Sequence, residues 1–241
     1  MARHQAAERE KSVSVLASLL PFLSVLYSEF IFAYFAHMPI TPVKVWMALG
    51  LGGIALALSR TTPLKGLNFL LLTVWTVGLW GFTFVQFLYR QMFGVCMGLK
   101  AGIKGLEFLA GLVQIIGQNW LFSLLMIVVP VLHFTLTRSL LKRRVSVLGK
   151  LTGANWMAPL GAWLLSAILI FAGVVLGLRG TAGEPSERQL LMTRFDGEAS
   201  LQSFGAAPEF LLDVKYNVLH IAGEETVEYY LVQDGKDPVQ V

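Results

Sequence analysis

The chain has 241 residues, of which 55% are hydrophobic and 14% charged, and its mean hydropathy is +0.64. Soluble domains carry about 25% charged residues, so this composition excludes an ordinary soluble domain and indicates an integral membrane protein. The net charge of +4 does not indicate a nucleic-acid partner, because most Lys and Arg residues lie in short segments beside the apolar runs.

Five apolar runs predict an all-α membrane protein with five transmembrane helices. A helix rises 1.5 Å per residue, so a run of roughly 20 residues crosses the hydrocarbon core of a bilayer, about 30 Å thick. The predicted spans are 13–36, 43–58, 67–88, 120–136 and 157–178, and the second is the shortest. The charged segment 1–12 before the first run is typical of a signal peptide, but no small-x-small cleavage motif follows. We therefore expect the first span to be retained.

Lys and Arg residues predict the orientation of these spans, since cytoplasmic loops carry an excess of both. Ten of them fall in the N-terminal segment and in the loops 59–66 and 137–156, whereas the opposite loops hold four. The ten are Arg3, Arg9, Lys11, Arg60, Lys65, Arg138, Lys142, Arg143, Arg144 and Lys150, and the four are Lys44, Arg90, Lys100 and Lys104. The N-terminus is therefore predicted to be cytoplasmic and the tail 179–241 extracellular.

The segment 89–119 between the third and fourth spans is unusually apolar for a loop. Phe108, Leu109, Leu112, Val113 and Ile116 recur at spacings of three and four residues. This spacing predicts an amphipathic helix, lying along the outer interface or packed over the mouth of the bundle. Glycines at 94, 98 and 102 permit close helix contact at this point, or equally give the chain flexibility near a turn.

The tail begins with a Gly- and Pro-containing linker, "RGTAGEPSER", and then becomes apolar again. In the segment 208–221, five apolar residues fall on one helical face, which predicts a juxtamembrane helix on the membrane or on the helix of 105–118. The competing interpretation is a short strand of an incomplete outer domain. "ETVEYYLV" (224–231) has the composition of a strand, but a lone strand is not stable in water, and we expect the chain to supply no partner for it.

A catalytic constellation is not visible in the sequence. The four histidines are scattered without metal-ligand spacing, and the single cysteine, Cys96, excludes an internal disulfide and a cysteine-based zinc site. "GLKAGIKG" lacks the Gly-Lys-Ser/Thr order of a phosphate loop. We therefore predict no catalytic residue, metal site or cofactor in this chain.

Glu29 and His133 lie inside predicted spans, where ionisable groups are functional candidates by default. Glu29 lies in the outer half of the first span, and Arg90 at the outer end of the third span is its predicted partner by depth. A structural tie between spans is favoured for Glu29. His133 in the fourth span is predicted to be a neutral, hydrogen-bonded imidazole. Tyr89 and Arg90 alternatively contact a lipid phosphate, to which Arg offers a bidentate fork.

Three segments resemble the membrane region of lipoteichoic acid synthase-like proteins, phosphoglycerol transferases of the alkaline phosphatase and sulfatase superfamily. They are "LPFLSVLYSEFIFAYF" (20–35), "FLYRQMFG" (87–94) and "FLLDVKYNVLHI" (210–221). The predicted layout of the chain also resembles that of the family. It consists of five spans, an amphipathic insert between the third and fourth spans, and a juxtamembrane segment after the fifth. The resemblance covers nearly the whole chain, although each motif is mainly an apolar pattern with a few polar residues.

This resemblance implies a membrane module of the bacterial cell membrane that acts in cell-envelope polymer synthesis. In the family, an extracellular sulfatase-like domain with a threonine nucleophile and a manganese ion takes glycerol phosphate from phosphatidylglycerol, and related members transfer phosphoethanolamine. We expect that domain to be absent from this chain, so any enzymatic activity would lie elsewhere, on a missing domain or a separate sulfatase-like chain. Membrane lipids, phosphatidylglycerol among them, are the implied partners, with lipid-contact candidates at Tyr89, Arg90, Lys100, Lys104 and Lys215.

Two other functions compete with this interpretation. A non-enzymatic membrane protein that binds lipid or recruits a partner protein fits the same composition. A small transporter is disfavoured, because the spans lack paired charged residues along a path and no inverted repeat is apparent.

Overall fold

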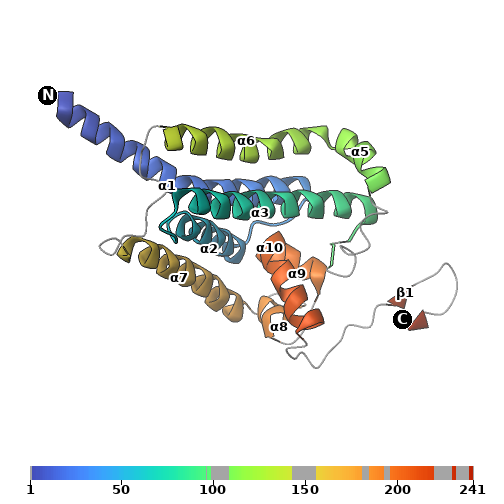
Figure 1. The fold of residues 1–241 in the computed structure, drawn as a ribbon. Helices are drawn as coiled ribbons and strands as arrows, with labels where there is room; N and C mark the ends of the chain where they lie inside the picture. The colour runs from blue at the N-terminus through green and yellow to red at the C-terminus, as the bar shows by residue number, and fades with distance from the viewer. Residues whose placement is uncertain are drawn as a thin grey trace.

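The computed structural model describes residues 2–95, 97–98, 109–142, 156–180, 185–192, 196–219, 230–231 and 239–240, and these are almost entirely helical. Long helices lie side by side in a bundle, and a group of short helices covers one end of it (Figure 1). The long helices are α1 (Ala2–Phe35), α2 (Pro42–Leu58), α3 (Lys65–Phe93), α6 (Trp120–Lys142) and α7 (Met157–Arg179). The short helices of the tail are α8 (Glu187–Met192), α9 (Gly197–Phe204), α10 (Ala206–Asp213) and the π-helical turn η1 (Val214–Val218).

Local sequence accounts for two of the helix boundaries. Thr41 caps the start of α2 by accepting a hydrogen bond from the Lys44 N–H, and Pro42 occupies the first helical position, where its missing N–H costs nothing. α3 ends at Gly94, which adopts a left-handed conformation (φ +72°) that favours glycine over other residues. α2 therefore begins within one residue of its predicted start at 43, whereas α3 continues five residues beyond its predicted end at 88, until this glycine.

The five predicted spans coincide with five helices, but not all of these helices meet the requirements of a membrane span. By length and apolar composition α1, α3 and α7 can each cross a bilayer. The fourth candidate is a bent pair, because α5 (Leu109–Gln118) meets α6 at 95°. α2 is apolar but has only 17 residues, about 26 Å of helix against about 30 Å of hydrocarbon. The described chain is therefore a helical, multi-pass type of membrane protein with three to four candidate spans.

α2 and α7 approach each other closely through small residues. A Cβ added to Gly50 would lie 2.4 Å from Ile170 Cγ1, and one added to Gly53 would lie 3.0 Å from the Ser166 Cα. The Ser166 hydroxyl donates a 2.8 Å hydrogen bond to the Gly50 carbonyl. Close backbone contact supplemented by a polar bond is how helices associate where lipid weakens the hydrophobic effect.

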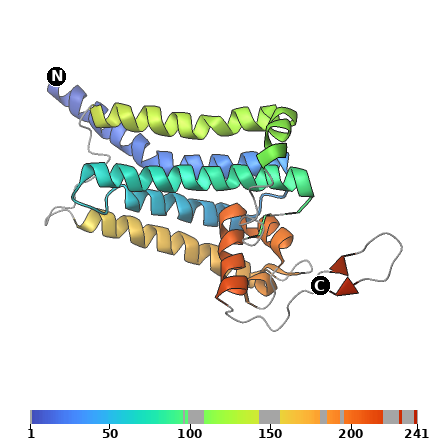
Figure 2. The ribbon, with the colours of Figure 1, turned by 45° about the vertical axis from the view of Figure 1, so that its right-hand side comes forward.

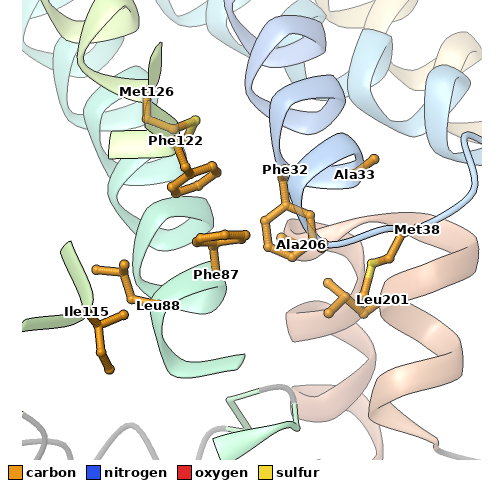
Figure 3. Close-up of a cluster of buried hydrophobic side chains, with 11 residues drawn as sticks. Phe32, Ala33, Met38, Phe87, Leu88, Ile115, Phe122, Met126, Leu201 and Ala206 are labelled. Carbon is orange, nitrogen blue, oxygen red and sulfur yellow. The ribbon is translucent and has the colours of Figure 1, made fainter. Parts of the chain in front are cut away.

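The largest core cluster joins α1, α3, α5 and α6 to the tail (Figure 3). The rings of Phe87 and Phe122 stack with centroids 3.6 Å apart, and Phe32 meets Phe87 edge to face at 6.1 Å. Leu201 of α9 and Ala206 of α10 are fully buried beside Phe32 and Met38. The tail thus contributes side chains to the interior of the bundle itself.

The turned view separates the bundle from the tail helices and shows that α8, α9 and α10 gather at the end of α7 (Figure 2). The predicted segment 208–221 is helical from Ala206 to Val218, so the strand interpretation is wrong for these residues. α10 packs against α3 and α9, and the Phe210 and Phe82 rings lie 5.0 Å apart. α8 and α9 were not predicted, because they have only six and eight residues.

The strand-like segment 224–231 has a partner in the chain, contrary to the prediction. Of this segment the structure describes Tyr230 and Leu231 (β1), which pair antiparallel with Val239 and Gln240 (β2). The predicted interfacial helix is partly described: α5 occupies 109–118, whereas residues 99–108 lie outside the described part of the chain. Its position along a membrane interface stays a prediction.

Candidate functional site

Buried polar side chains gather where α9 and α10 close one end of the bundle. We refer to this group as the polar dock, and its members are Glu29, Lys44, Gln86, Ser200, Glu209 and Asp213, each at most 5% exposed. They come from the last turns of α1, the first turn of α2, the last part of α3, and the tail helices. Burial of such groups is costly unless they are hydrogen-bonded, so their partners reveal what the dock does.

Glu29 of α1 holds the start of α10. Its Oε1 accepts a hydrogen bond of 3.3 Å from the N–H of Ala206, the first residue of α10. The N-cap position of this helix is Gly205, which has no side chain to offer. A carboxylate at a helix N-terminus satisfies an otherwise unpaired N–H and faces the positive end of the helix dipole. Glu29 therefore caps a helix that lies 177 residues further along the chain.

Gly205 is required at this joint for two reasons. Its φ of +96° lies in a region that other residues rarely adopt. A Cβ at this position would also lie 2.7 Å from Glu29 Oε2 and 3.0 Å from the carboxyl carbon. The glycine thus permits both the turn between α9 and α10 and the approach of the carboxylate.

The first turn of α2 forms the second attachment of the tail. The Thr41 hydroxyl donates a 2.6 Å hydrogen bond to the Ser203 carbonyl near the end of α9. Lys44, only 1% exposed, donates from Nζ to the Pro39 carbonyl at 3.1 Å, and its charge acts on Glu29. A buried cation near a buried carboxylate lowers the cost of burying both.

The last part of α3 forms the third attachment. Gln86 donates from Nε2 to Glu209 Oε2 at 3.3 Å and accepts at Oε1 from the Met97 N–H at 3.1 Å. Arg90 forms an ion pair with Glu198 of α9. The predicted partnership of Arg90 with Glu29 is wrong, because the tail folds back and supplies a different partner to each.

A small cavity lies beside Glu29, between α1, α2, α3 and α6. It is lined in part by the hydroxyl side chains of Ser24, Ser28, Thr76 and Thr83, and the volume open to the centre of a water molecule is about 10 Å³. Such a volume holds about one water. Within the described residues, Glu29 Oε2 has no hydrogen-bond partner, so it is the polar atom that a water in this cavity would satisfy.

The other predicted site residues have separate surroundings. His133 Nε2 lies 3.0 Å from Thr73 Oγ1 and joins α6 to α3, which agrees with a hydrogen-bonded imidazole. Tyr89 is half-buried and its ring lies 4.5 Å from that of Phe93. Lys100 and Lys104 lie outside the described residues.

Lys215 also serves the packing of the tail. Its Nζ donates to the Leu191 carbonyl at 2.6 Å and lies 4.4 Å from the centroid of the Tyr216 ring. Partial burial lowers the pKa of Lys215 and raises the pKa of Tyr216, whose hydroxyl donates to the Leu190 carbonyl. These contacts hold α8 against η1.

Lys44, Gln86, Glu198, Gly205 and Glu209 were missed by the sequence reasoning. Glu209 and Asp213 stand four residues apart in an apolar helix, and that spacing was a usable signal for a polar buried face. In the parts of the chain that the structure describes, no group of three His, Cys, Asp or Glu side chains could hold a metal ion. The contacts of the polar dock attach the tail to the bundle.

Comparison of the chain with protein-family models, with curated proteins and with solved structures gives no significant match.

Proposed function

We propose that this chain is the membrane-anchoring, lipid-presenting module of a lipoteichoic acid synthase-like phosphoglycerol transferase of the bacterial cell membrane. Its role would be to hold a sulfatase-like catalytic domain, on the same protein or on a separate chain, next to phosphatidylglycerol or a phosphoethanolamine lipid at the outer membrane surface. The order of the three resembling segments and the helical layout support this proposal. The chemistry, with its manganese ion, would belong to that catalytic domain.

The observation that carries the proposal is the attachment of the tail. Residues 196–218 are fixed to α1, α2 and α3 by the Glu29, Thr41, Gln86 and Arg90 contacts described above. A free linker would leave the position of an attached domain undefined. A docked tail would instead restrict both the distance of that domain from the membrane and the orientation of that domain. Ordering each tail residue costs about 1–2 kcal/mol of backbone entropy, and the contacts of the tail must offset this cost. We infer that the tail is ordered because its position matters for function.

Lipid-release and lipid-binding measurements on the purified chain test this proposal. In nanodiscs containing phosphatidylglycerol and manganese, the chain alone should release no diacylglycerol. In detergent it should retain phosphatidylglycerol in preference to phosphatidylcholine. Turnover by the chain alone would contradict the non-catalytic role, and equal retention of both lipids would contradict lipid presentation.

A partner experiment separates the proposal from simple lipid binding. Crosslinking in native membranes followed by mass spectrometry should recover sulfatase-like peptides crosslinked to the tail residues 196–219. These peptides would come either from a domain of the same protein or from a separate chain. Recovery of lipid with no such sequence would favour the non-enzymatic lipid-binding alternative.

A further inference from the structure

The outer face of α7 carries a continuous apolar stripe. Leu164, Ile168 and Phe171 are all more than half exposed and follow one another at spacings of four and three residues. Val175 and Leu178 continue the same spacing, so all five fall on one side of the helix. On a helix that can cross a bilayer, such a face contacts acyl chains.

The stripe leads to a polar end. α7 ends at Arg179, which is exposed, and α8 packs back against its last turn. A Cβ on Gly177 would lie 2.9 Å from Leu191 Cδ1, so Leu191 faces α7. The opposite side of α8 is open, and a cavity of about 480 Å³ is lined there by Leu178, Arg188, Gln189 and Met192.

The charges around this cavity favour an anion. Arg188 is exposed and, among the described residues, forms no ion pair, in contrast to Arg90. The neighbouring acid is Glu187, which is folded against Gly180, and burial raises the pKa of its carboxyl group. Among the described residues, Arg179 and Arg188 are both exposed and form no ion pair. Asp213, on the adjacent tail helix, is buried and accepts a hydrogen bond from Asn217.

Depth identifies the source of the anion. α7 is a candidate span that ends at Arg179, so in a bilayer crossed by α7 the cavity would lie at the level of the lipid headgroups, directly above the apolar stripe. Arg presents a fork of N–H donors that matches phosphate geometry, and Leu178 and Met192 supply apolar walls. A soluble phosphate would contact the arginine side chains but would make no contact with the apolar stripe of α7.

We infer that an anionic phospholipid binds to the outer face of α7, with its phosphate on Arg188, reinforced by Arg179, and one acyl chain along Leu164–Leu178. This site deepens the lipid-presenting role and rests on that proposed function. It also replaces Arg90 as the main lipid contact, since the guanidinium of Arg90 is engaged by Glu198.

Native mass spectrometry of the full chain in detergent tests the site, with phosphatidylglycerol, phosphatidylcholine or inorganic phosphate added in turn. The wild-type chain should retain one phosphatidylglycerol that neither phosphatidylcholine nor inorganic phosphate displaces. Arg188→Gln should weaken this binding about tenfold, because one charge-assisted contact contributes roughly 1.5 kcal/mol. Arg188→Lys should weaken it less.

Lys65→Gln is the matched control, since it removes one positive charge at the first residue of α3, at the opposite end of the bundle. It should change the affinity by less than about twofold. Phosphatidylglycerol binding that is equally strong in Arg188→Gln and Lys65→Gln would overturn this site and leave the lipid-presenting proposal standing. Absence of any preference for phosphatidylglycerol in the wild-type chain would contradict both. Displacement by inorganic phosphate would overturn the assignment to a lipid.

Discussion

Removal of the Glu29 carboxylate should release the tail from the bundle. In Glu29→Leu the Ala206 N–H loses its acceptor while it stays buried, and α10 loses the charge at its N-terminus. An unsatisfied buried N–H costs about 1–3 kcal/mol, and loss of a helix cap costs about 0.5–2 kcal/mol. These two values describe the same bond and are not added. We therefore expect the docked state of α10 to lose about 1–3 kcal/mol.

Glu29→Gln is the informative companion variant. The amide keeps an oxygen that can accept from the Ala206 N–H and has nearly the same volume, but it removes the negative charge near Lys44. Its expected cost is below about 1 kcal/mol, the size of a helix-dipole effect, because Lys44 keeps its hydrogen bond to the Pro39 carbonyl. Phe30→Leu, at a partly exposed position of the same helix, controls for substitution in α1 as such.

Hydrogen exchange followed by mass spectrometry measures the docking directly. The amides of residues 206–213 should exchange about 5- to 150-fold faster in Glu29→Leu than in the wild-type chain, and less than about fivefold faster in Glu29→Gln. Exchange in α7 should not change in either variant, which separates undocking from global unfolding. Equal exchange in Glu29→Leu and wild type would refute the capping role, and equal exchange in both variants would refute the role of the oxygen acceptor.

Three further experiments test the turn at Gly205, the contact of α2 with α7, and the ion pair of Arg90 with Glu198. Gly205→Ala should destabilise the tail by about 1–3 kcal/mol, because of its positive φ and the approach of Glu29, whereas Gly78→Ala meets nothing within 4 Å and should be neutral in the same exchange assay. Gly50→Leu should separate α2 from α7 at a cost of about 1–3 kcal/mol or more, seen as a lower midpoint of thermal unfolding in detergent, and Gly81→Leu should leave that midpoint nearly unchanged. A double-mutant cycle of Arg90→Gln with Glu198→Gln should give a coupling energy of at most about 1 kcal/mol, because the two side chains are 21% and 35% exposed; a value near zero would make this pair incidental.

The long helices could be predicted from sequence because each is specified locally. A run of apolar residues, a cap such as Thr41 and a stop such as Gly94 are all visible within one segment of chain. Membrane crossing by α2 stays a prediction, since its 17 residues form about 26 Å of helix against about 30 Å of hydrocarbon. The tail helices α8 and α9 carry weak local signals and acquire their stability from tertiary contacts.

The site was harder to predict, because its contacts join residues that are far apart in the chain. Glu29 was recognised as unusual from its depth, yet depth alone suggested Arg90 as its partner. The real partner is a backbone N–H, and every residue except proline offers one, so no residue type could point to Ala206. Gly205 marks the place where Glu29 approaches the start of α10. The sequence alone does not reveal this, because the need for glycine follows from the packing of α10 against α1.

The dock also explains why charged groups are kept at the end of a bundle that could have been closed by apolar packing alone. Apolar contacts such as Phe82 with Phe210 attract the tail but allow sliding, because many arrangements bury similar area. A hydrogen bond to the first N–H of α10 and a second from Thr41 to the Ser203 carbonyl permit one register only. We therefore expect the polar contacts of the dock to contribute specificity more than net stability. Such specificity holds residues 196–218 in one position at the end of the bundle.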